Sequence, residues 1–230
     1  MPAHGGCQGW RSIAAMGSVT RATSDARRRR AEVTERVLAA VEQLLADGER
    51  FTEIPVQRIA ERSGMSRPAF YQYFPDKSDV LIRVADVAAQ AFFAGPAEWF
   101  ADDESLDRGV DGVAHAIRIT LAEFRKHWTL MRALGEVAAY DADVAEFWFG
   151  RIDAFITDAA ERVARWQAQG RVDAAVTGES VAALTWMVER SVTQHVLHPT
   201  FPADSECLAD ERLVMALSRT IWLTVTGGPA

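Results

Sequence analysis

The chain has 230 residues, of which 49% are hydrophobic and 25% charged, and its formal net charge is −7. That length can bury a sizeable core, and this composition is typical of a folded globular protein. The sequence shows no uninterrupted apolar run long enough to span a membrane and no secretory signal, and its two distant cysteines indicate neither a disulfide framework nor a metal site. We therefore expect a cytoplasmic protein without a membrane partner.

The charge is divided unequally along the chain. Residues 1–83 carry 13 Lys and Arg against 10 Asp and Glu, whereas the remainder carries 12 against 22. A basic N-terminal part on an acidic body is compatible with nucleic-acid binding at one end of the molecule. Ordinary variation in surface charge produces asymmetries of this size as well, so the charge alone does not decide the function.

The N-terminal segment divides into a tail and a helix. Residues 1–25 mix Gly, Ser, Ala, Thr and Arg without periodicity, which predicts a disordered tail, and Met16 within it is an alternative start. Four arginines at 27–30 begin a helix that is expected to end at Asp47, and apolar residues recur along it at helical spacing. The arginine run suits DNA phosphates or a minor groove, but it equally suits a solvated helix end.

The stretch from Ile59 to Phe74 predicts two short helices joined by a tight turn. Gly64 ends the first helix, because glycine adopts the left-handed conformation at low cost. Ser66 is a helix cap, and Pro68 lies just inside the second helix, where its missing N–H does no harm. This order is that of a helix-turn-helix motif, so we expect a three-helix DNA-binding domain over residues 26–75.

The remainder, residues 76–230, is expected to form one larger helical body. Asp76 caps a fourth helix, and Gly95-Pro96 predicts a break or kink in it. Apolar periodicity predicts further helices at residues 106–127, 128–137, 141–169, 178–196 and 206–225. No segment shows the alternation of a strand. The sequence therefore predicts an all-α fold of about nine helices, in which the fourth helix joins the head to the body.

The second helix of the motif carries side chains suited to reading DNA bases. Arg67 can pair with guanine, Gln72 can pair with adenine, and Ala69 can contact a thymine methyl group. We expect these three residues, together with Tyr73, to face the bases. Tyr73 equally suits a role in covering the flank of the domain.

Other residues of the motif suit the DNA backbone. Thr52, Tyr71 and Lys77 are expected to contact phosphates. Ser66 and Pro68 shape the start of the second helix, whose backbone N–H groups are further phosphate donors. Both residues therefore belong to the expected DNA-contact set.

The run from Ile59 to Lys77, followed by Val80-Leu81, resembles the DNA-binding head of the TetR family. It keeps that family's turn of a small residue, glycine, an apolar residue and serine, its aromatic pair ending in tyrosine, and the phenylalanine and lysine that follow. Segments 66–71, 144–148, 187–190 and 221–222 are similar to the ethionamide-resistance regulator branch of the family.

The resemblance implies a homodimer whose two heads meet successive major grooves of a palindromic DNA operator. Dimerisation would use the last two helices, about 178–196 and 206–226, packed across a two-fold axis. These helices carry much apolar surface for terminal helices, although that surface can also face the chain's own core.

The resemblance also implies a pocket for a small hydrophobic ligand in the body. Matched residue by residue, its lining is expected to comprise Val113, Thr120, Phe124, Trp148, Ile152, Phe155, Thr185, Val188, Thr193 and Trp222. Aromatic positions of the branch become Val113 and Thr120 here, and its paired amides become Thr185 and Val188. We therefore expect an apolar site whose polar anchor has changed, with a filled aromatic core as the alternative.

These features predict a transcriptional repressor in which a bound ligand shifts the fourth helix and lowers DNA affinity. A helix-turn-helix activator and a DNA binder without a ligand are the alternatives. An enzyme fits less well, because His115, His127, His195 and His198 form no catalytic or metal-binding pattern, and no phosphate loop, nucleophile elbow or zinc motif is present. No cofactor, metal site or catalytic residue is expected.

Overall fold

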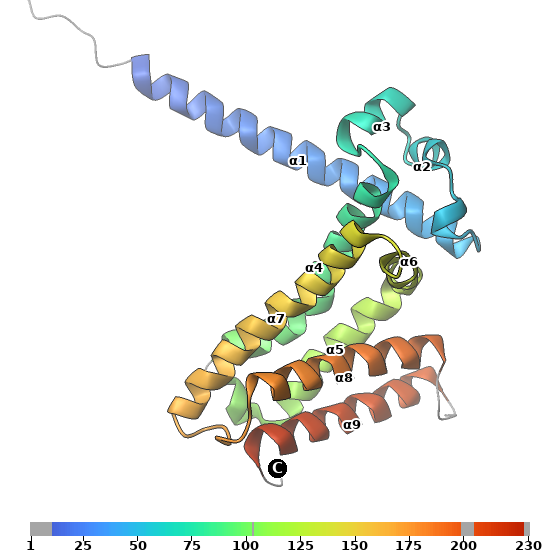
Figure 1. Ribbon diagram of the computed structural model, residues 1–230. Helices are drawn as coiled ribbons and strands as arrows, with labels where there is room; N and C mark the ends of the chain where they lie inside the picture. The colour runs from blue at the N-terminus through green and yellow to red at the C-terminus, as the bar shows by residue number, and fades with distance from the viewer. Residues whose placement is uncertain (1–10, 103, 199–204, 228–230) are drawn as a thin grey trace, which may run out of the picture.

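The computed structural model describes residues 11–102, 104–198 and 205–227, and within these ranges every regular element is helical (Figure 1). The nine α-helices found there are α1 (Arg11–Ala46), α2 (Val56–Arg62), α3 (Arg67–Tyr73), α4 (Lys77–Ala101), α5 (Gly109–Lys126), α6 (Trp128–Ala138), α7 (Ala142–Ala168), α8 (Gly178–Leu197) and α9 (Glu206–Thr226). Two 3-10 helices, η1 (Phe51–Glu53) and η2 (Ser105–Arg108), lie between them. The predicted all-α fold is confirmed for the described chain.

The first helix is longer than the sequence pattern predicted. α1 begins at Arg11, so the expectation of a disordered tail was wrong for residues 11–25, whereas residues 1–10 lie outside the described chain. Once the packed half of a helix exists, each further residue adds one hydrogen bond without a new nucleation cost. This stretch contains no proline, so the helix continues through it although it lacks an apolar face.

The second half of α1 forms the base of the DNA-binding head. Val37, Val41 and Leu44 are fully buried, and α1 packs there against α2 and α4. Phe70 of α3 and Phe74 immediately after it are buried in the same core. The three helices of the head therefore share one apolar centre, and Figure 1 shows α2 and α3 together beside the C-terminal half of α1.

α4 connects the head to the body without interruption. Of the break or kink expected at Gly95-Pro96, the break is not observed: α4 continues through both residues to Ala101. A Cβ atom placed on Gly95 would lie 2.8 Å from the carbonyl oxygen of Ala116 and 2.8 Å from the Cβ of Ile119. The glycine therefore permits a close approach between α4 and α5, and this packing holds the helix together across the proline.

α4 also has the length and composition of a membrane-spanning helix, and it is the one such helix in the described part of the chain. Its apolar side chains are instead buried between α1, α5 and α7, with Val80, Leu81 and Val84 completely inaccessible. It is the core helix of this fold.

The body arranges its helices around α4 and α5. α4 packs on α5 and α7, α5 packs on α9, and α8 packs on α7 and α5. Figure 1 shows α8 and α9 side by side at the end of the body away from the head.

Helix caps fix where the last three helices begin. Asp141 accepts backbone hydrogen bonds at the start of α7, and Thr177 forms a capping box with Ser180 at the start of α8. Ser205 caps α9.

Candidate nucleic-acid interface and internal cavity

The turn between α2 and α3 has a specific backbone geometry. Gly64 has a φ of +70°, its N–H donates to the carbonyl of Glu61 at 3.1 Å, and the N–H of Met65 donates to the carbonyl of Ala60 at 2.8 Å. This pair of bonds is a Schellman motif, which satisfies the last carbonyls of α2 and turns the chain sharply. The predicted turn is confirmed.

The start and the inner face of α3 are both fixed. The hydroxyl of Ser66 accepts a hydrogen bond from the N–H of Ala69 at 3.4 Å, and Pro68 lies in the first turn. On the inner face, the rings of Phe70 and Phe74 are buried with centroids 5.0 Å apart. Because the inner face is locked into the core, the opposite face of α3 is presented to solvent in a fixed orientation.

The exposed face of α3 carries most of the predicted DNA contacts. Arg67, Tyr71 and Gln72 are exposed, as are Ser66 and Pro68. The guanidinium carbon of Arg67 lies 5.7 Å from the centroid of the Tyr71 ring, a cation–π contact that holds the two side chains together. The structure thus gathers these groups on one surface.

The remaining predicted contacts are more enclosed. Ala69 and Tyr73 are half-buried, whereas Thr52 on η1 is exposed. Lys77 at the start of α4 is also half-buried, and its Nζ lies 4.9 Å from the ring centroid of Phe51. Burial lowers the pKa of Lys77. Of these four residues, only Thr52 is fully accessible, and the other three are partly covered.

The sequence pattern did not place the arginine run next to the end of α3. Arg28, Arg29 and Arg36 of α1 line a groove together with Tyr73 at the end of α3, and the acidic side chains of Glu32 and Glu35 line it as well. Arg28 also forms ion pairs with Asp25 at 3.4 Å and with Glu32 at 3.6 Å. Exposed ion pairs of this kind contribute little to stability. Charged side chains of α1, three basic and two acidic, therefore border the end of α3.

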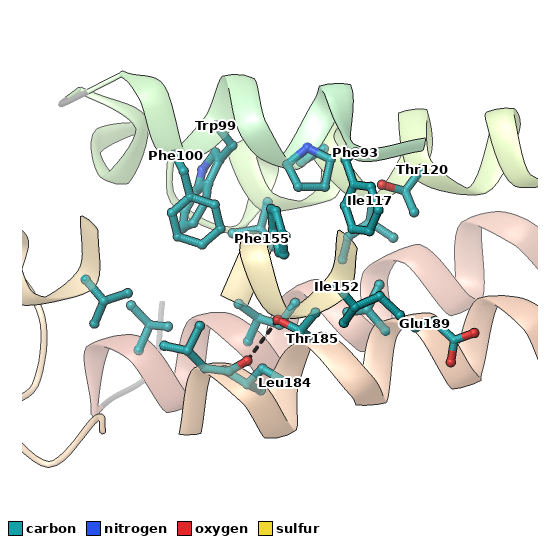
Figure 2. A pocket seen from close by; sticks show the side chains of 18 of the residues that line it. Phe93, Trp99, Phe100, Ile117, Thr120, Ile152, Phe155, Leu184, Thr185 and Glu189 are labelled. Carbon is teal, nitrogen blue, oxygen red and sulfur yellow. Dashed lines mark hydrogen bonds between the residues drawn. The ribbon is translucent and has the colours of Figure 1, made fainter. Parts of the chain in front are cut away.

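An internal cavity of about 100 Å³ lies in the body between α4, α5, α7, α8 and α9. Its walls are almost entirely apolar: Phe92, Phe93, Pro96, Trp99, Phe100, Val113, Ala116, Ile117, Thr120, Ile152, Phe155, Val163, Trp166, Val181, Leu184, Thr185, Val188, Glu189, Ile221 and Val225. Figure 2 shows the aromatic rings of α4 and Phe155 of α7 converging on this space. The arrangement suits an apolar ligand.

The residues that the resemblance implied as pocket lining divide into two groups. Six of them line the cavity: Val113, Thr120, Ile152, Phe155, Thr185 and Val188. The other four do not. Phe124 and Trp148 are buried behind Phe92, with ring centroids 6.0 Å and 6.3 Å from it, and Thr193 and Trp222 are half-buried elsewhere on α8 and α9.

The aromatic wall from α4 was missed in the sequence. Phe92, Phe93, Pro96, Trp99 and Phe100 all line the cavity. Their spacing of three, four and seven residues could have placed them on one helical face, which is a usable signal. That signal cannot show whether the face meets a partner tightly or leaves a gap.

The hydroxyl groups in the cavity already have partners. Thr120 donates to the backbone carbonyl of Phe92 at 3.2 Å, and Thr185 donates to the carbonyl of Val181 at 2.9 Å. The indole N–H groups of Trp99 and Trp166, which also line the cavity, are buried without a hydrogen-bond partner.

The cavity wall also contains a carboxylate. Oε1 of Glu189 accepts a hydrogen bond from the hydroxyl of Thr193 at 3.2 Å, whereas Oε2 is buried and has no hydrogen-bond donor. Nε of Arg190 lies 3.9 Å from Oε2, but that arginine side chain is 75% exposed. Glu189 and Arg190 therefore form a long ion pair in which the arginine side chain lies in solvent.

Polar contacts join the head to the body. The buried His127 between α5 and α6 is paired through Nδ1 with Glu42 of α1. The hydroxyl of Ser78 in α4 donates to Oδ2 of Asp141 at 2.5 Å, and this bond lowers the pKa of Asp141. The pair of His127 and Glu42 thus ties the head to the body, and the bond between Ser78 and Asp141 fixes the first turn of α4 against α7.

A second polar cluster joins the last helices. His195 of α8 lies 2.9 Å from Oδ1 of Asp210 in α9, and Arg125 of α5 donates to the same carboxylate at 2.6 Å. In the residues that the structure describes, no three His, Cys, Asp or Glu side chains are grouped as metal ligands. His195 therefore acts in an interhelical hydrogen-bond network.

A helix-turn-helix with an exposed second helix, mounted on a helical body that encloses a cavity, defines a DNA-binding transcriptional regulator. Residues 39–84 match the bacterial regulatory proteins of the tetR family, and residues 113–228 match the C-terminal domain of the transcriptional regulator EthR. The chain belongs to the TetR family of transcriptional regulators and has a C-terminal domain of the EthR type.

Individual relatives agree with this assignment. The HTH-type transcriptional regulator EthR of Mycobacterium tuberculosis is 29% identical over 196 residues, which covers 82% of this chain and 84% of that protein. The EthR of Mycolicibacterium smegmatis is 28% identical over 194 residues, with the same coverage of 82% and 84%. Among solved structures, a TetR-family regulator from Syntrophomonas wolfei has a TM-score of 0.67 at 16% identity, covering 84% of this chain and 95% of that one. Salmonella enterica GusR has a TM-score of 0.62 at 16% identity, covering 86% and 96%, and these two likenesses concern the fold alone.

Proposed function

We propose that this regulator is a repressor that binds a palindromic DNA operator as a homodimer and leaves it when a small hydrophobic ligand enters the cavity. The observation that carries the proposal is the course of α4. Its first residue, Lys77, lies directly after the helix-turn-helix, and its C-terminal part supplies five of the side chains that line the cavity. One rigid helix therefore connects the ligand site to the DNA-reading surface.

In this proposal α3 lies in the major groove. Arg67 and Gln72 read base edges, and Ala69 and Tyr73 contact bases at the border of the interface. Tyr71, Thr52 and Lys77 hold phosphates, as do the N–H groups at the start of α3 that Ser66 and Pro68 shape. The exposure of Arg67, Tyr71 and Gln72 on one face supports these roles.

The dimer is proposed to form through α8 and α9. In the single chain, Leu208 and Leu223 of α9 remain 38% and 49% exposed, and Trp186, Met187 and Leu213 are only half-buried. Apolar side chains that stay accessible along two neighbouring helices favour an isologous contact with a second copy. Such a dimer would place two α3 helices on one operator.

The small size of the cavity suggests how a ligand could move the head. Sites for drug-sized ligands usually measure about 300–1,000 Å³, whereas this cavity measures about 100 Å³. A larger ligand would have to displace the rings of Phe93, Phe100 and Phe155, two of which belong to α4. A ligand that prefers the expanded body then shifts the population toward a state with displaced heads.

A titration of operator binding tests this proposal. An operator duplex, selected from random DNA with the full-length protein, is labelled with a fluorophore, and its anisotropy reports binding as apolar compounds are added. The expected result is that compounds shown by calorimetry to bind the protein weaken operator binding. Val188→Phe, which fills the cavity, is expected to keep operator binding and to lose the response.

A DNA binder that responds to no ligand is the second candidate, and the small volume of the cavity favours it. In that case, compounds that bind the body leave the operator affinity unchanged, which contradicts our proposal. We propose no enzymatic reaction for this chain.

A further inference from the structure

The carboxylate of Glu189 is the one charged group in the cavity wall among the described residues. Its residue is half-buried on α8, and the side chain is 12% exposed. Oε1 receives the Thr193 hydroxyl at 3.2 Å, while Oε2 is buried without a donor. Oε2 is therefore an acceptor without a hydrogen-bond donor, and because it is covered, a ligand can reach it only when the surrounding side chains move.

A half-satisfied buried carboxylate is costly. A carboxylate that is removed from water is destabilised unless partners replace the water, and a single hydroxyl replaces only part of it. Arg190 does not complete the shell, because its Nε is 3.9 Å from Oε2, beyond hydrogen-bond distance, and its side chain lies in solvent. Among the residues lining the cavity, the threonine hydroxyls donate to backbone carbonyls instead.

The two ends of the cavity differ in chemistry. Figure 2 shows Thr120 and Glu189 at one end and Trp99 and Phe100 at the other, with Phe93 and Phe155 between them. Apart from Glu189, the described side chains of the wall carry no charge, and none is a lysine or arginine. A molecule that fills this space must offer apolar or aromatic groups along most of its length and a hydrogen-bond donor at one end.

We propose that the ligand of this cavity is a cationic amphiphile, namely an aromatic or aliphatic body that ends in a protonated amine. The ammonium group donates to Oε2 of Glu189, and the apolar body lies along Phe93, Phe155 and Phe100. Positive charge is favoured over a neutral donor because it also cancels the buried negative charge. The proposal rests on the proposed function, since it assigns a ligand class to the cavity through which DNA release would be controlled.

Three compounds with the same carbon skeleton test the charge preference. These are 4-phenylbutylamine, 4-phenylbutan-1-ol and 4-phenylbutyrate, whose affinities for the full-length protein are measured by isothermal titration calorimetry at pH 7. We expect the amine to bind about tenfold or more tightly than the alcohol, and the carboxylate to bind most weakly. An amine that binds no better than the alcohol, or failure of the amine to bind, overturns the proposal without any variant.

Two variants locate the preference. Glu189→Gln keeps the shape and removes the charge, and is expected to abolish the advantage of the amine over the alcohol. Glu161→Gln removes the same charge from an exposed position on α7 and is expected to leave the advantage intact. Persistence of the amine preference in Glu189→Gln, or its loss in Glu161→Gln, overturns the assignment to Glu189. Circular dichroism checks that both variants are folded.

Operator binding in the same samples separates this inference from the repressor proposal. If the alcohol and the amine bind equally and both release DNA, the amine assignment is wrong and the repressor proposal stands. If the amine binds through Glu189 but operator affinity does not change, the ligand class is supported and the repressor proposal fails.

Discussion

Individual side chains of α3 have separate tasks. Phe70 and Phe74 are buried and fix the helix against α1, while Arg67 and Gln72 are exposed and free of core packing. Ser66 and Gly64 set the start of α3 and the end of α2 through hydrogen bonds within a few residues. Because stability and recognition use opposite faces, changes on the exposed face should alter binding without altering the fold.

Arg67→Ala tests this separation. Loss of a bidentate contact to guanine is expected to weaken binding of the selected operator by about tenfold, while the midpoint of thermal unfolding stays near that of the wild type. Fluorescence anisotropy and circular dichroism supply the two readouts. Arg165→Ala, an exposed arginine at the far end of α7, serves as the control for lost positive charge. Equal effects of the two substitutions would argue against base readout by Arg67.

For individual residues, the sequence correctly predicted the features that depend on near neighbours in the chain, namely helix caps and a left-handed glycine. The caps at Ser66 and Asp76 and the left-handed glycine at position 64 are all observed, because each depends on residues within four positions. The unpaired Oε2 of Glu189 could not be foreseen. Its surroundings come from α8, α4 and α5, and only the packing of these helices shows which donors are absent.

Among the helices, α4 connects the most parts of the molecule, because it follows the helix-turn-helix directly, lines the cavity and packs on α5. At Gly95 the backbone of α4 lies so close to α5 that a Cβ atom would clash. The Gly95-Pro96 pair predicted a break or kink there, since Gly-Pro usually interrupts helices, but the long-range contact with α5 keeps the helix continuous. The same long-range packing left a cavity that a helical wheel of α4 could not reveal.

Gly95→Ala is expected to destabilise the protein by about 1–3 kcal/mol. The new Cβ would lie 2.8 Å from a backbone oxygen of Ala116, so one of the two helices must shift. Urea denaturation followed by circular dichroism measures the change. Gly150→Ala, on α7 with open space around the new methyl group, is the matched control and is expected to be neutral or stabilising. Unchanged stability in Gly95→Ala would show that α4 and α5 do not pack this closely in solution.

The hydrogen bond from Ser78 to Asp141 joins the first turn of α4 to the start of α7. It is the largest of the contacts that lower the pKa of Asp141 below its ordinary value of 3.8. An aspartate whose pKa is lower in the folded than in the unfolded protein stabilises the folded state at pH values above its unfolded-state pKa. This stabilisation is lost as the pH falls through the pKa of the folded state.

Ser78→Ala is therefore expected to be less stable than the wild type at pH 6, and the difference should shrink as the pH falls below 3.8. The effect should be modest, because Asp141 is only half-buried and solvent screens its charge. Thermal unfolding of both proteins between pH 2.5 and 6 measures it. A difference that is independent of pH would mean that the hydroxyl stabilises the helices by some route other than the Asp141 carboxylate.

For the whole molecule, the proposed mechanism requires a dimer of two copies of the chain. α8 and α9 supply the partly accessible apolar surface, and the polar cluster of Arg125, His195 and Asp210 fixes how these helices sit on α5. Only a dimer converts a movement of α4 into a change in the spacing between two α3 helices.

Leu223→Asp is expected to convert the dimer into a monomer with unchanged helical content, because it places a charge on the most exposed large apolar side chain of α9. Light scattering coupled to size-exclusion chromatography measures the mass against the 25.4 kDa of one chain. Tyr140→Asp, at a position 65% exposed before α7, is the control and should remain dimeric. A dimeric Leu223→Asp protein would place the interface elsewhere.

The central claim is that occupation of the cavity reaches α3 through α4, and the separation of the two heads tests it most directly. A spin label is attached at Gln57→Cys on the exposed side of α2, with Cys7→Ser and Cys207→Ser removing the native thiols. Pulsed electron resonance then gives the distance between the two labels in the dimer, with and without a compound that calorimetry shows to bind. The account predicts that the compound moves the distance distribution to different values in the wild-type background and leaves it unchanged in Val188→Phe. An unchanged distribution under saturating compound, in a protein that nonetheless releases its operator, would contradict the account.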